Sequence, residues 1–225
     1  MSLNNNNIIF DFDSTIIQLE TIEVIAEIAL KNNSNKKNIL EEIKTTTSLA
    51  MNGEIPFDVA LNNRLSLLNI QKNHIDKTIK YLKTKLTKSF VENIDFINKN
   101  LDKIFIISGG FKEIILPILA PYKINEKNIY ANTFIYNKSG TVESVNLKNP
   151  LSKNKGKCMA AKNIKGNNII IGDGYTDFEL KKNNFAKLFI LFTENVSRNE
   201  LKKDADFIAN NFNEAFNYIK NVTKE

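Results

Sequence analysis

Residues 7–15 read Asn-Ile-Ile-Phe-Asp-Phe-Asp-Ser-Thr, and this stretch decides the fold. It is a short apolar run that ends in acidic and hydroxyl residues, which is typical of a buried parallel strand that finishes at a functional edge of its sheet. Asp11 and Asp13 stand two residues apart on extended backbone, so both carboxylates project toward one face. They repel each other unless a cation or a proton lies with them. The pair therefore predicts either a Mg²⁺ site at the carboxyl edge of a parallel sheet or an ordinary acidic turn.

The same succession of strand, loop and helix recurs along the chain. Apolar runs typical of buried strands return three times, at residues 103–107, 168–171 and 187–192. Helical spacing of apolar residues separates them, at residues 111–120, 156–163 and 175–183. Alternation of this kind predicts an α/β fold in which helices cover both faces of a parallel sheet.

Two insertions interrupt the predicted sheet. Residues 16–88 carry helical spacing and no strand run, so we expect a helical cap that enters directly after the first strand and lies over the sheet edge. Residues 130–145 alternate apolar and polar side chains around Asn-Lys-Ser-Gly, which predicts a small β-hairpin insertion. We therefore expect an α/β core domain at residues 1–15 and 89–225 and a cap domain at residues 16–88.

Composition narrows the possible chemistry. The 225 residues include one cysteine, Cys158, and one histidine, His74, which excludes an internal disulfide, a multi-cysteine zinc site and histidine-rich metal clusters. Catalysis must therefore use mainly carboxylates, hydroxyl groups and lysines. The net charge is +6, but the densest lysine stretch, 153–165, contains no aromatic residue, so we expect no nucleic-acid partner. No apolar run approaches the roughly 20 residues of a membrane span, so we expect a cytoplasmic protein with no membrane partner.

Three more polar elements follow the predicted strands. Ser-Gly-Gly at 108–110 joins a strand to a helix, and such a loop binds an anion through its N–H groups or simply caps the helix. Gly-Asp-Gly-Tyr-Thr-Asp at 172–177 brings two further carboxylates to the same edge, where one is enough for a helix cap. Lys155 precedes a helix and is placed to neutralise a phosphate and a nucleophilic carboxylate. Its rivals for that role are Lys153, Lys157 and Lys162.

In this order the elements resemble those of the haloacid dehalogenase (HAD) superfamily of phosphohydrolases and, within it, the phosphoserine phosphatase family. Asp-Phe-Asp-Ser-Thr at 11–15, Ser-Gly-Gly-Phe at 108–111 and Gly-Asp-Gly-x-Thr-Asp at 172–177 match the family motifs. The resemblance covers nearly the whole chain. It implies a Rossmann-like core with a helical cap, a phosphatase of serine biosynthesis, and Mg²⁺ as the cofactor.

The resemblance extends into the predicted cap, where the superfamily selects its substrates. The family's glutamate falls on Glu20, and its Met-x-Gly-x-x-Pro-Phe motif and following arginine fall on residues 51–57 and Arg64. For a phosphoserine zwitterion, Glu20 is expected to pair with the ammonium group and Arg64 to form a bidentate contact with the carboxylate. Met51 and Phe57 are expected to exclude water above the bond that breaks.

For the reaction, the resemblance implies that Asp11 attacks phosphorus and forms an aspartyl-phosphate. Asp13 protonates the leaving oxygen and then activates the water that hydrolyses this intermediate. Mg²⁺ is expected to bind to Asp11, the backbone carbonyl of Asp13 and Asp173, while Asp177 orients water or Lys155. The residues expected to contact the phosphoryl group or to lie beside it are Ser108, Gly109, Gly110, Lys155 and Thr176.

Other functions remain open at this point. A phosphotransferase would pass the phosphoryl group from Asp11 to an alcohol such as homoserine, and a related phosphatase would act on another small phosphomonoester. A signalling module of the receiver type also gathers carboxylates, a hydroxyl group and a lysine on a parallel sheet, but it lacks the helical insertion. In the favoured interpretation the partner is a small phosphomonoester, and the chain is a monomer or a homodimer.

Overall fold

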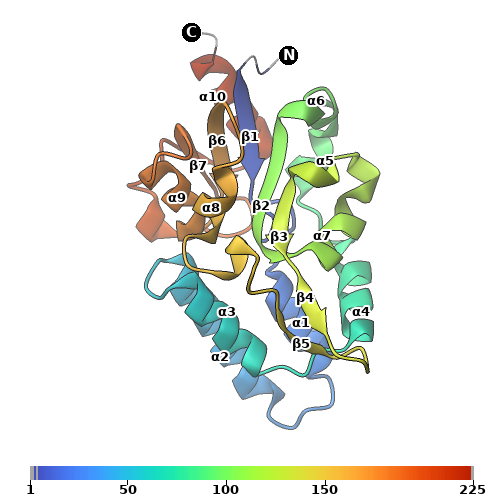
Figure 1. Cartoon of the computed structure of the whole chain (residues 1–225). Helices are drawn as coiled ribbons and strands as arrows, with labels where there is room; N and C mark the ends of the chain where they lie inside the picture. The colour runs from blue at the N-terminus through green and yellow to red at the C-terminus, as the bar shows by residue number, and fades with distance from the viewer. Residues whose placement is uncertain (1–2, 4, 224–225) are drawn as a thin grey trace.

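The computed structural model describes residues 3 and 5–223, and its centre is a six-stranded sheet. Neighbouring strands are parallel throughout, in the order β3-β2-β1-β6-β7-β8. The strands are β1 (Asn6–Phe10), β2 (Ile104–Phe111), β3 (Ile129–Asn132), β6 (Asn167–Gly172), β7 (Leu188–Phe192) and β8 (Phe207–Ala209). The predicted parallel α/β sheet is confirmed, and the strand that opens the chain runs through its middle (Figure 1).

Alternate residues of β1 enter two different hydrophobic cores. Ile8 and Phe10 belong to the core on one face of the sheet, whereas Ile9 belongs to the core on the other face. Successive side chains of a strand point to opposite faces, so three consecutive buried apolar residues require cover on both faces. The helices that supply this cover are α7 (Lys112–Leu119), α10 (Phe212–Val222), α8 (Gly156–Ala161) and α9 (Tyr175–Lys182).

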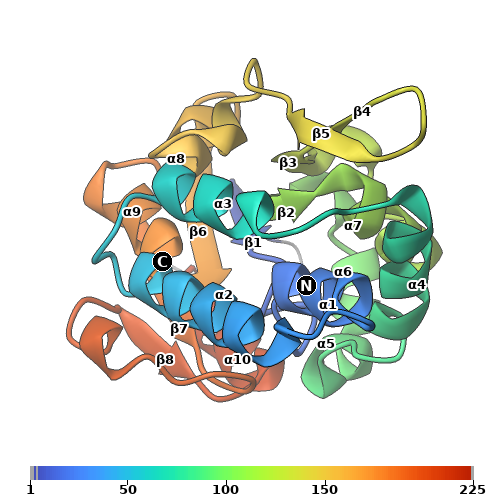
Figure 2. The ribbon, with the colours of Figure 1, turned by 90° about the horizontal axis from the view of Figure 1, so that it is seen from below.

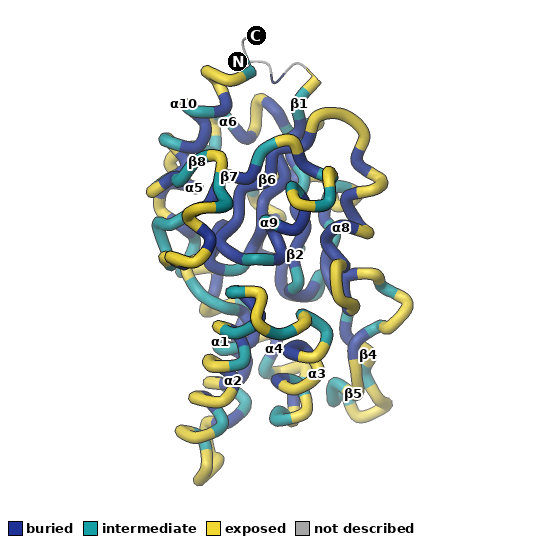
Figure 3. The backbone as a smooth tube through the Cα atoms, turned by 90° about the vertical axis from the view of Figure 1, so that its left-hand side faces the viewer, coloured by how far each residue is buried: buried dark blue, intermediate teal, exposed yellow. Residues whose placement is uncertain are grey.

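Between β1 and β2 the described chain forms helices and no strand of the sheet. These helices are α1 (Thr21–Ala29), α2 (Lys36–Met51), α3 (Phe57–Ser66), α4 (Lys72–Leu82), α5 (Lys88–Glu92) and α6 (Ile94–Asn98). Figures 1 and 2 show α1, α2 and α3 beyond the end of the sheet at which β1 stops, which is the place expected for the inserted cap. In Figure 3 the buried tube is concentrated in the sheet, while much of α2 is exposed. The domain limits at residues 16 and 88 stay predictions.

The two connections between the sheet and the cap helices run side by side. Ile17 and Leu86 form an antiparallel bridge, and the N–H of Thr87 donates to the carbonyl of Ile16 at 2.9 Å. The hydroxyl of Thr87 donates to the carbonyl of Thr15 at 2.6 Å. We call this pairing of residues 16–17 with residues 86–87 the hinge ladder, and we expect any movement of the cap relative to the sheet to pivot there.

The edges of the sheet differ from the sequence prediction. The segment 130–145 was expected to form only a hairpin, but its start belongs to β3, and the hairpin consists of β4 (Phe134–Tyr136) and β5 (Val142–Val145). Strand β8 was not predicted, because three residues are too few to show an alternating pattern. No helix in the described part of the chain combines the length and the apolar composition that crossing a membrane requires.

Candidate active site

The carboxyl ends of β1 and β6 lie next to each other and bring two acidic loops together. The N–H of Asp11, directly after β1, donates to the carbonyl of Ile171 in β6 at 3.0 Å. Asp173 directly follows β6, and Asp177 stands in the first turn of α9. One carboxylate oxygen from each of Asp11, Asp173 and Asp177 lies within 4.8 Å of the others, and all three residues are buried. We call these three residues the aspartate triad.

The aspartate triad suits a divalent cation. Burial raises the pKa of Asp173 and of Asp177, and the neighbouring carboxylates raise both further. A hard divalent cation relieves such repulsion and prefers oxygen ligands. Two of the expected ligands, Asp11 and Asp173, belong to the triad, and so does Asp177, which was expected only to orient water or a lysine. The side chain of Asp13 is not part of it, and the proposed ligation through the Asp13 carbonyl stays a prediction.

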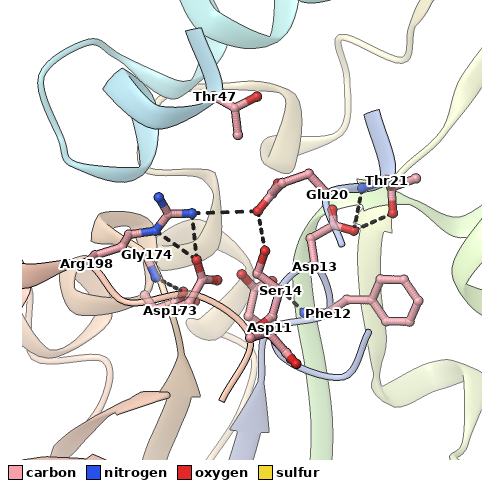
Figure 4. Close-up of polar contacts among 12 residues, drawn as sticks. Asp11, Phe12, Asp13, Ser14, Glu20, Thr21, Thr47, Asp173, Gly174 and Arg198 are labelled. Carbon is pink, nitrogen blue, oxygen red and sulfur yellow. Dashed lines mark hydrogen bonds and ion pairs between the residues drawn. The ribbon is translucent and has the colours of Figure 1, made fainter. Parts of the chain in front are cut away.

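Asp13 points toward the first turn of α1. Its Oδ1 accepts hydrogen bonds from the N–H of Thr21, at 3.1 Å, and from the Thr21 hydroxyl (Figure 4). Burial, and then the nearby charge of Glu20, raise the pKa of Asp13 well above its ordinary value. The raised pKa favours the protonated carboxyl, which is the form that a general acid needs.

Among the described residues, Lys157, one of the rivals of Lys155, is the lysine that pairs with carboxylates of the triad, and the expected contact of Lys155 with the phosphoryl group stays a prediction. Nζ of Lys157 lies 2.9 Å from Oδ2 of Asp11 and 2.7 Å from Oδ1 of Asp177. Burial alone would lower the pKa of Lys157, but the two carboxylates outweigh it and raise the pKa. Lys155 adopts left-handed backbone (φ 57°) directly before α8 and is exposed at the edge of the site. The first turn of α8 therefore directs residue 157 to the carboxylates.

Residues 108–110 lie in the last part of β2, not in the loop expected from the sequence, and form another wall of the site. Oγ of Ser108 accepts a hydrogen bond from the N–H of Gly110 at 2.9 Å, and Ser108 is fully buried. Gly109 lies so close to the cap that a Cβ there would stand 2.5 Å from the ring of Phe57. Gly109 and Gly110 line the same cavity as Asp11. Only a residue without a side chain allows β2 to approach Phe57 so closely.

The cavity beneath the cap has a volume of 40 Å³. Most of the predicted site residues line it, namely Asp11, Asp13, Glu20, Met51, Phe57, Arg64, Gly109, Gly110 and Thr176, together with Lys157. A cavity of this volume has room for only a few water molecules. Because a phosphomonoester is larger than this cavity, we expect the cap to move when one enters. Oγ1 of Thr176 is buried and has no hydrogen-bond partner among the described residues, so it is available to a ligand.

Arg64 brings a buried positive charge to the cavity. It is 4% exposed, its Nε donates to the carbonyl of Ala60 at 3.0 Å, and its Nη1 donates to Oγ1 of Thr47 at 3.0 Å. Both partners are neutral. No carboxylate of the described residues lies within 4 Å of the guanidinium, and burial lowers the pKa of Arg64 from its ordinary value. A buried cation in this state is expected to bind an anionic ligand.

Glu20 directly precedes α1. Its carboxylate contacts two side chains that the sequence analysis did not connect with it. Its Oε1 accepts a hydrogen bond from Oγ of Ser14 at 2.7 Å and lies 3.7 Å from Nη2 of Arg198. Sequence reasoning gave no role to Arg198, Thr21 or Thr47. The available signal was weak: Arg198 is one of two arginines in a lysine-rich chain. Thr21 and Thr47 have no distinguishing pattern at all.

The known proteins that are similar to this chain include phosphoserine phosphatases. Residues 8–182 match the haloacid dehalogenase-like hydrolase family. The chain is similar to the phosphoserine phosphatase of Methanocaldococcus jannaschii, with 31% identity over 95% of this chain and 97% of the relative. Its structure is similar to that of a phosphoserine phosphohydrolase-like protein from Francisella tularensis, with a TM-score of 0.87, 33% identity, and coverage of 95% of this chain and 99% of that one. A phosphoserine phosphatase solved as a phospho-aspartyl intermediate analogue gives a TM-score of 0.75 at 27% identity, over 94% of this chain and 97% of that one.

Proposed function

The chain belongs to the haloacid dehalogenase-like hydrolase family, and from this premise we propose that it hydrolyses O-phospho-L-serine to L-serine and inorganic phosphate, with Mg²⁺ bound at the aspartate triad. Phosphoserine phosphatases similar to it over nearly its whole length support the reaction class. The choice of substrate rests on the chemistry of the cavity.

The observation that carries the choice of substrate is the state of Arg64. Its guanidinium is buried at the cavity wall and paired only with neutral groups. A carboxylate on the substrate would supply the missing negative charge, and a guanidinium binds a carboxylate through two parallel hydrogen bonds. A phosphomonoester that carries a carboxylate is therefore the substrate class that this cavity suits.

Glu20 supports the amino-acid part of the substrate. It lines the same cavity as Arg64 and has one carboxylate oxygen, Oε2, that accepts no hydrogen bond from a described residue. The ammonium group of phosphoserine would pair with this carboxylate, while Met51 and Phe57 cover the reacting end with apolar surface. The two charged groups of the cap thus match the two charged groups of a zwitterion.

In the first half of the reaction, an oxygen of Asp11 attacks phosphorus and forms an aspartyl-phosphate as the ester P–O bond breaks. The electron pair of that bond goes to the serine oxygen, which takes the proton of the Asp13 carboxyl. In the second half, the Asp13 carboxylate accepts a proton from a water molecule that attacks phosphorus. Phosphate leaves, and Asp11 is again a free carboxylate.

Positive charge and hydrogen-bond donors surround the phosphoryl group in this arrangement. Lys157 neutralises Asp11 and the incoming phosphate, while Gly109, Gly110 and Oγ1 of Thr176 line the pocket for its oxygens. When bound by Asp11 and Asp173, with Asp177 beside them, Mg²⁺ supplies the charge that lets two anions approach each other. These contributions are mainly electrostatic, as is usual for phosphoryl transfer.

The test measures phosphate release from L-phosphoserine and from O-phosphoethanolamine, which has the same ammonium and phosphate groups but no carboxylate. We expect phosphoserine to be the better substrate, EDTA to abolish turnover and Mg²⁺ to restore it. Asp11→Asn should lose activity on both substrates. Arg64→Ala should reduce kcat/KM for phosphoserine by at least tenfold more than for phosphoethanolamine.

Two outcomes would contradict the proposal. Equal losses on both substrates in Arg64→Ala would remove the carboxylate contact, and a better turnover of an ester without a carboxylate would replace the substrate. The phosphotransferase alternative is tested in the same assay by adding homoserine. If phosphohomoserine forms in place of free phosphate, the chain is a transferase.

A further inference from the structure

Arg198 binds a carboxylate of the aspartate triad, although no step of the proposed reaction uses it. Its Nε and Nη2 lie 2.9 and 2.8 Å from the same oxygen, Oδ2 of Asp173, and its side chain is 9% exposed. Figure 4 shows both contacts. No described donor contacts Oδ1 of Asp173, so this second oxygen is left free for a ligand. The guanidinium therefore restrains the carboxylate without occupying both of its oxygens.

The loop that carries Arg198 is itself anchored to the site. Nδ2 of Asn195 lies 3.1 Å from the carbonyl oxygen of Ser14 and 2.7 Å from Oγ1 of Thr87. Ser14 belongs to the loop that carries Asp11, and Thr87 belongs to the hinge ladder. The segment that carries Arg198 is thus anchored near the site by contacts that do not involve Asp173.

We propose that Arg198 is a positioning residue for the metal site, which holds Oδ2 of Asp173 so that Oδ1 is presented to a divalent cation beside Asp11 and Asp177. Two effects oppose each other here. A fixed cation repels a second cation, whereas a ligand held in place binds a cation more tightly. The contact of both donors with a single oxygen indicates that orientation prevails, and loss of such a supporting partner typically weakens metal binding 10–100-fold.

The same guanidinium connects the metal site with the cap. Its Nη2 lies 3.7 Å from Oε1 of Glu20, which directly precedes α1. Arg198 thus stands between the residue proposed to hold the metal and the residue proposed to bind the ammonium group. This part of the inference rests on the proposed function, whereas the effect on metal binding rests only on the proposed metal site.

The experiment measures the Kd for Mg²⁺ by calorimetry on metal-free full-length protein without substrate. Arg198→Gln removes the charge and most donors, and Arg198→Lys keeps the charge with a single ammonium in place of the converging donors. Lys203→Gln, at an exposed position, is the matched control for net charge. We expect the Kd to rise about tenfold in Arg198→Gln, about threefold in Arg198→Lys, and not at all in Lys203→Gln. Raising Mg²⁺ to saturation should restore most of kcat in both Arg198 variants.

An unchanged or lower Kd in Arg198→Gln would overturn the proposal, because Arg198 would then be a structural ion pair or a competitor of the metal. An equal change in Lys203→Gln would also overturn it, since the effect would be one of net charge. If Arg198→Gln does not fold, Arg198→Lys decides alone, and a Kd equal to that of the wild type contradicts the proposal. If the wild type itself binds no Mg²⁺, the proposed metal site fails, whatever the variants do.

Discussion

At the scale of single residues, the structure decides which of two neighbouring lysines pairs with Asp11. Lys155 and Lys157 are separated only by Gly156. Lys155 directly precedes α8, and Lys157 is the second residue of that helix. The left-handed backbone of Lys155 places it outside the helix, and the first turn of α8 then buries the side chain of Lys157 between Asp11 and Asp177. Removing a buried cation from between two carboxylates leaves both of them without their partner, which is expected to be strongly unfavourable.

Replacing Lys157 with Met tests this assignment, because it keeps most of the side-chain length and removes the charge. We expect kcat to fall by about 10²–10³, the range typical of losing one group that stabilises charge in the transition state. Lys155→Met removes the same charge two residues away and should stay within about threefold of the wild type. Steady-state phosphate release measures both. If Lys155→Met is the more damaged variant, the ammonium that acts on the phosphoryl group belongs to residue 155.

At the scale of secondary-structure elements, two cap helices cooperate to hold one guanidinium. Arg64 stands in α3 and uses the carbonyl of Ala60, one turn earlier, as one partner. The other partner, Thr47, comes from α2, and its hydroxyl in turn donates to the carbonyl of Ile43 at 2.9 Å. The packing of α2 on α3 therefore sets the direction of the guanidinium.

Thr47→Val should weaken the binding of phosphoserine without changing the chemistry. The valine has nearly the same shape but leaves Nη1 of Arg64 without its partner, and a hydrogen bond to a charged group is worth about 1.5–3 kcal/mol. We expect KM for phosphoserine to rise at least about tenfold at nearly constant kcat, and KM for phosphoethanolamine to change little. Thr47→Ser, which keeps the hydroxyl, should restore KM. A fall in kcat on both substrates would instead indicate a general disturbance of the cap.

At the scale of the whole molecule, the cap covers a cavity too small for its proposed substrate. Contact across the closed interface is close, since a Cβ built on Gly174 in the core would lie 3.8 Å from Cβ of Met51 in α2. We therefore expect the cap to swing on the hinge ladder of residues 16–17 and 86–87 during turnover. A covalent link between the cap and the core should therefore prevent cap opening and, with it, product release.

A disulfide between residues 51 and 174 should block that step. The Cβ–Cβ distance of 3.8 Å equals the mean found in disulfides, so Met51→Cys combined with Gly174→Cys is expected to cross-link on mild oxidation. Burial raises the pKa of the single native thiol, Cys158, to about 11, which keeps it from competing. We expect the oxidised double variant to lose at least 90% of the activity of its reduced form, and dithiothreitol to restore it. Full activity in the cross-linked form would show that the cap need not open.

The sequence by itself determined the parts of this protein that local pattern controls. An apolar run that ends at Asp11, with further runs that end at glycine-containing loops, is enough to predict the parallel sheet and the edge at which the polar residues gather. The motif residues Asp11, Asp13, Ser108 and Asp173 follow directly, because each is the residue after a strand or lies within a few positions of its end. The helical spacing of residues 16–88 likewise predicted the cap helices.

Only the tertiary structure decided which charges meet. Lys157 rather than Lys155 pairs with Asp11 because of the backbone direction at the start of α8, which no periodicity records. Arg198 meets Asp173 across 25 residues, and Thr47 meets Arg64 across 17 residues and two helices. Such contacts depend on how separate elements pack, so the sequence names the groups that carry the chemistry, whereas packing alone selects their partners.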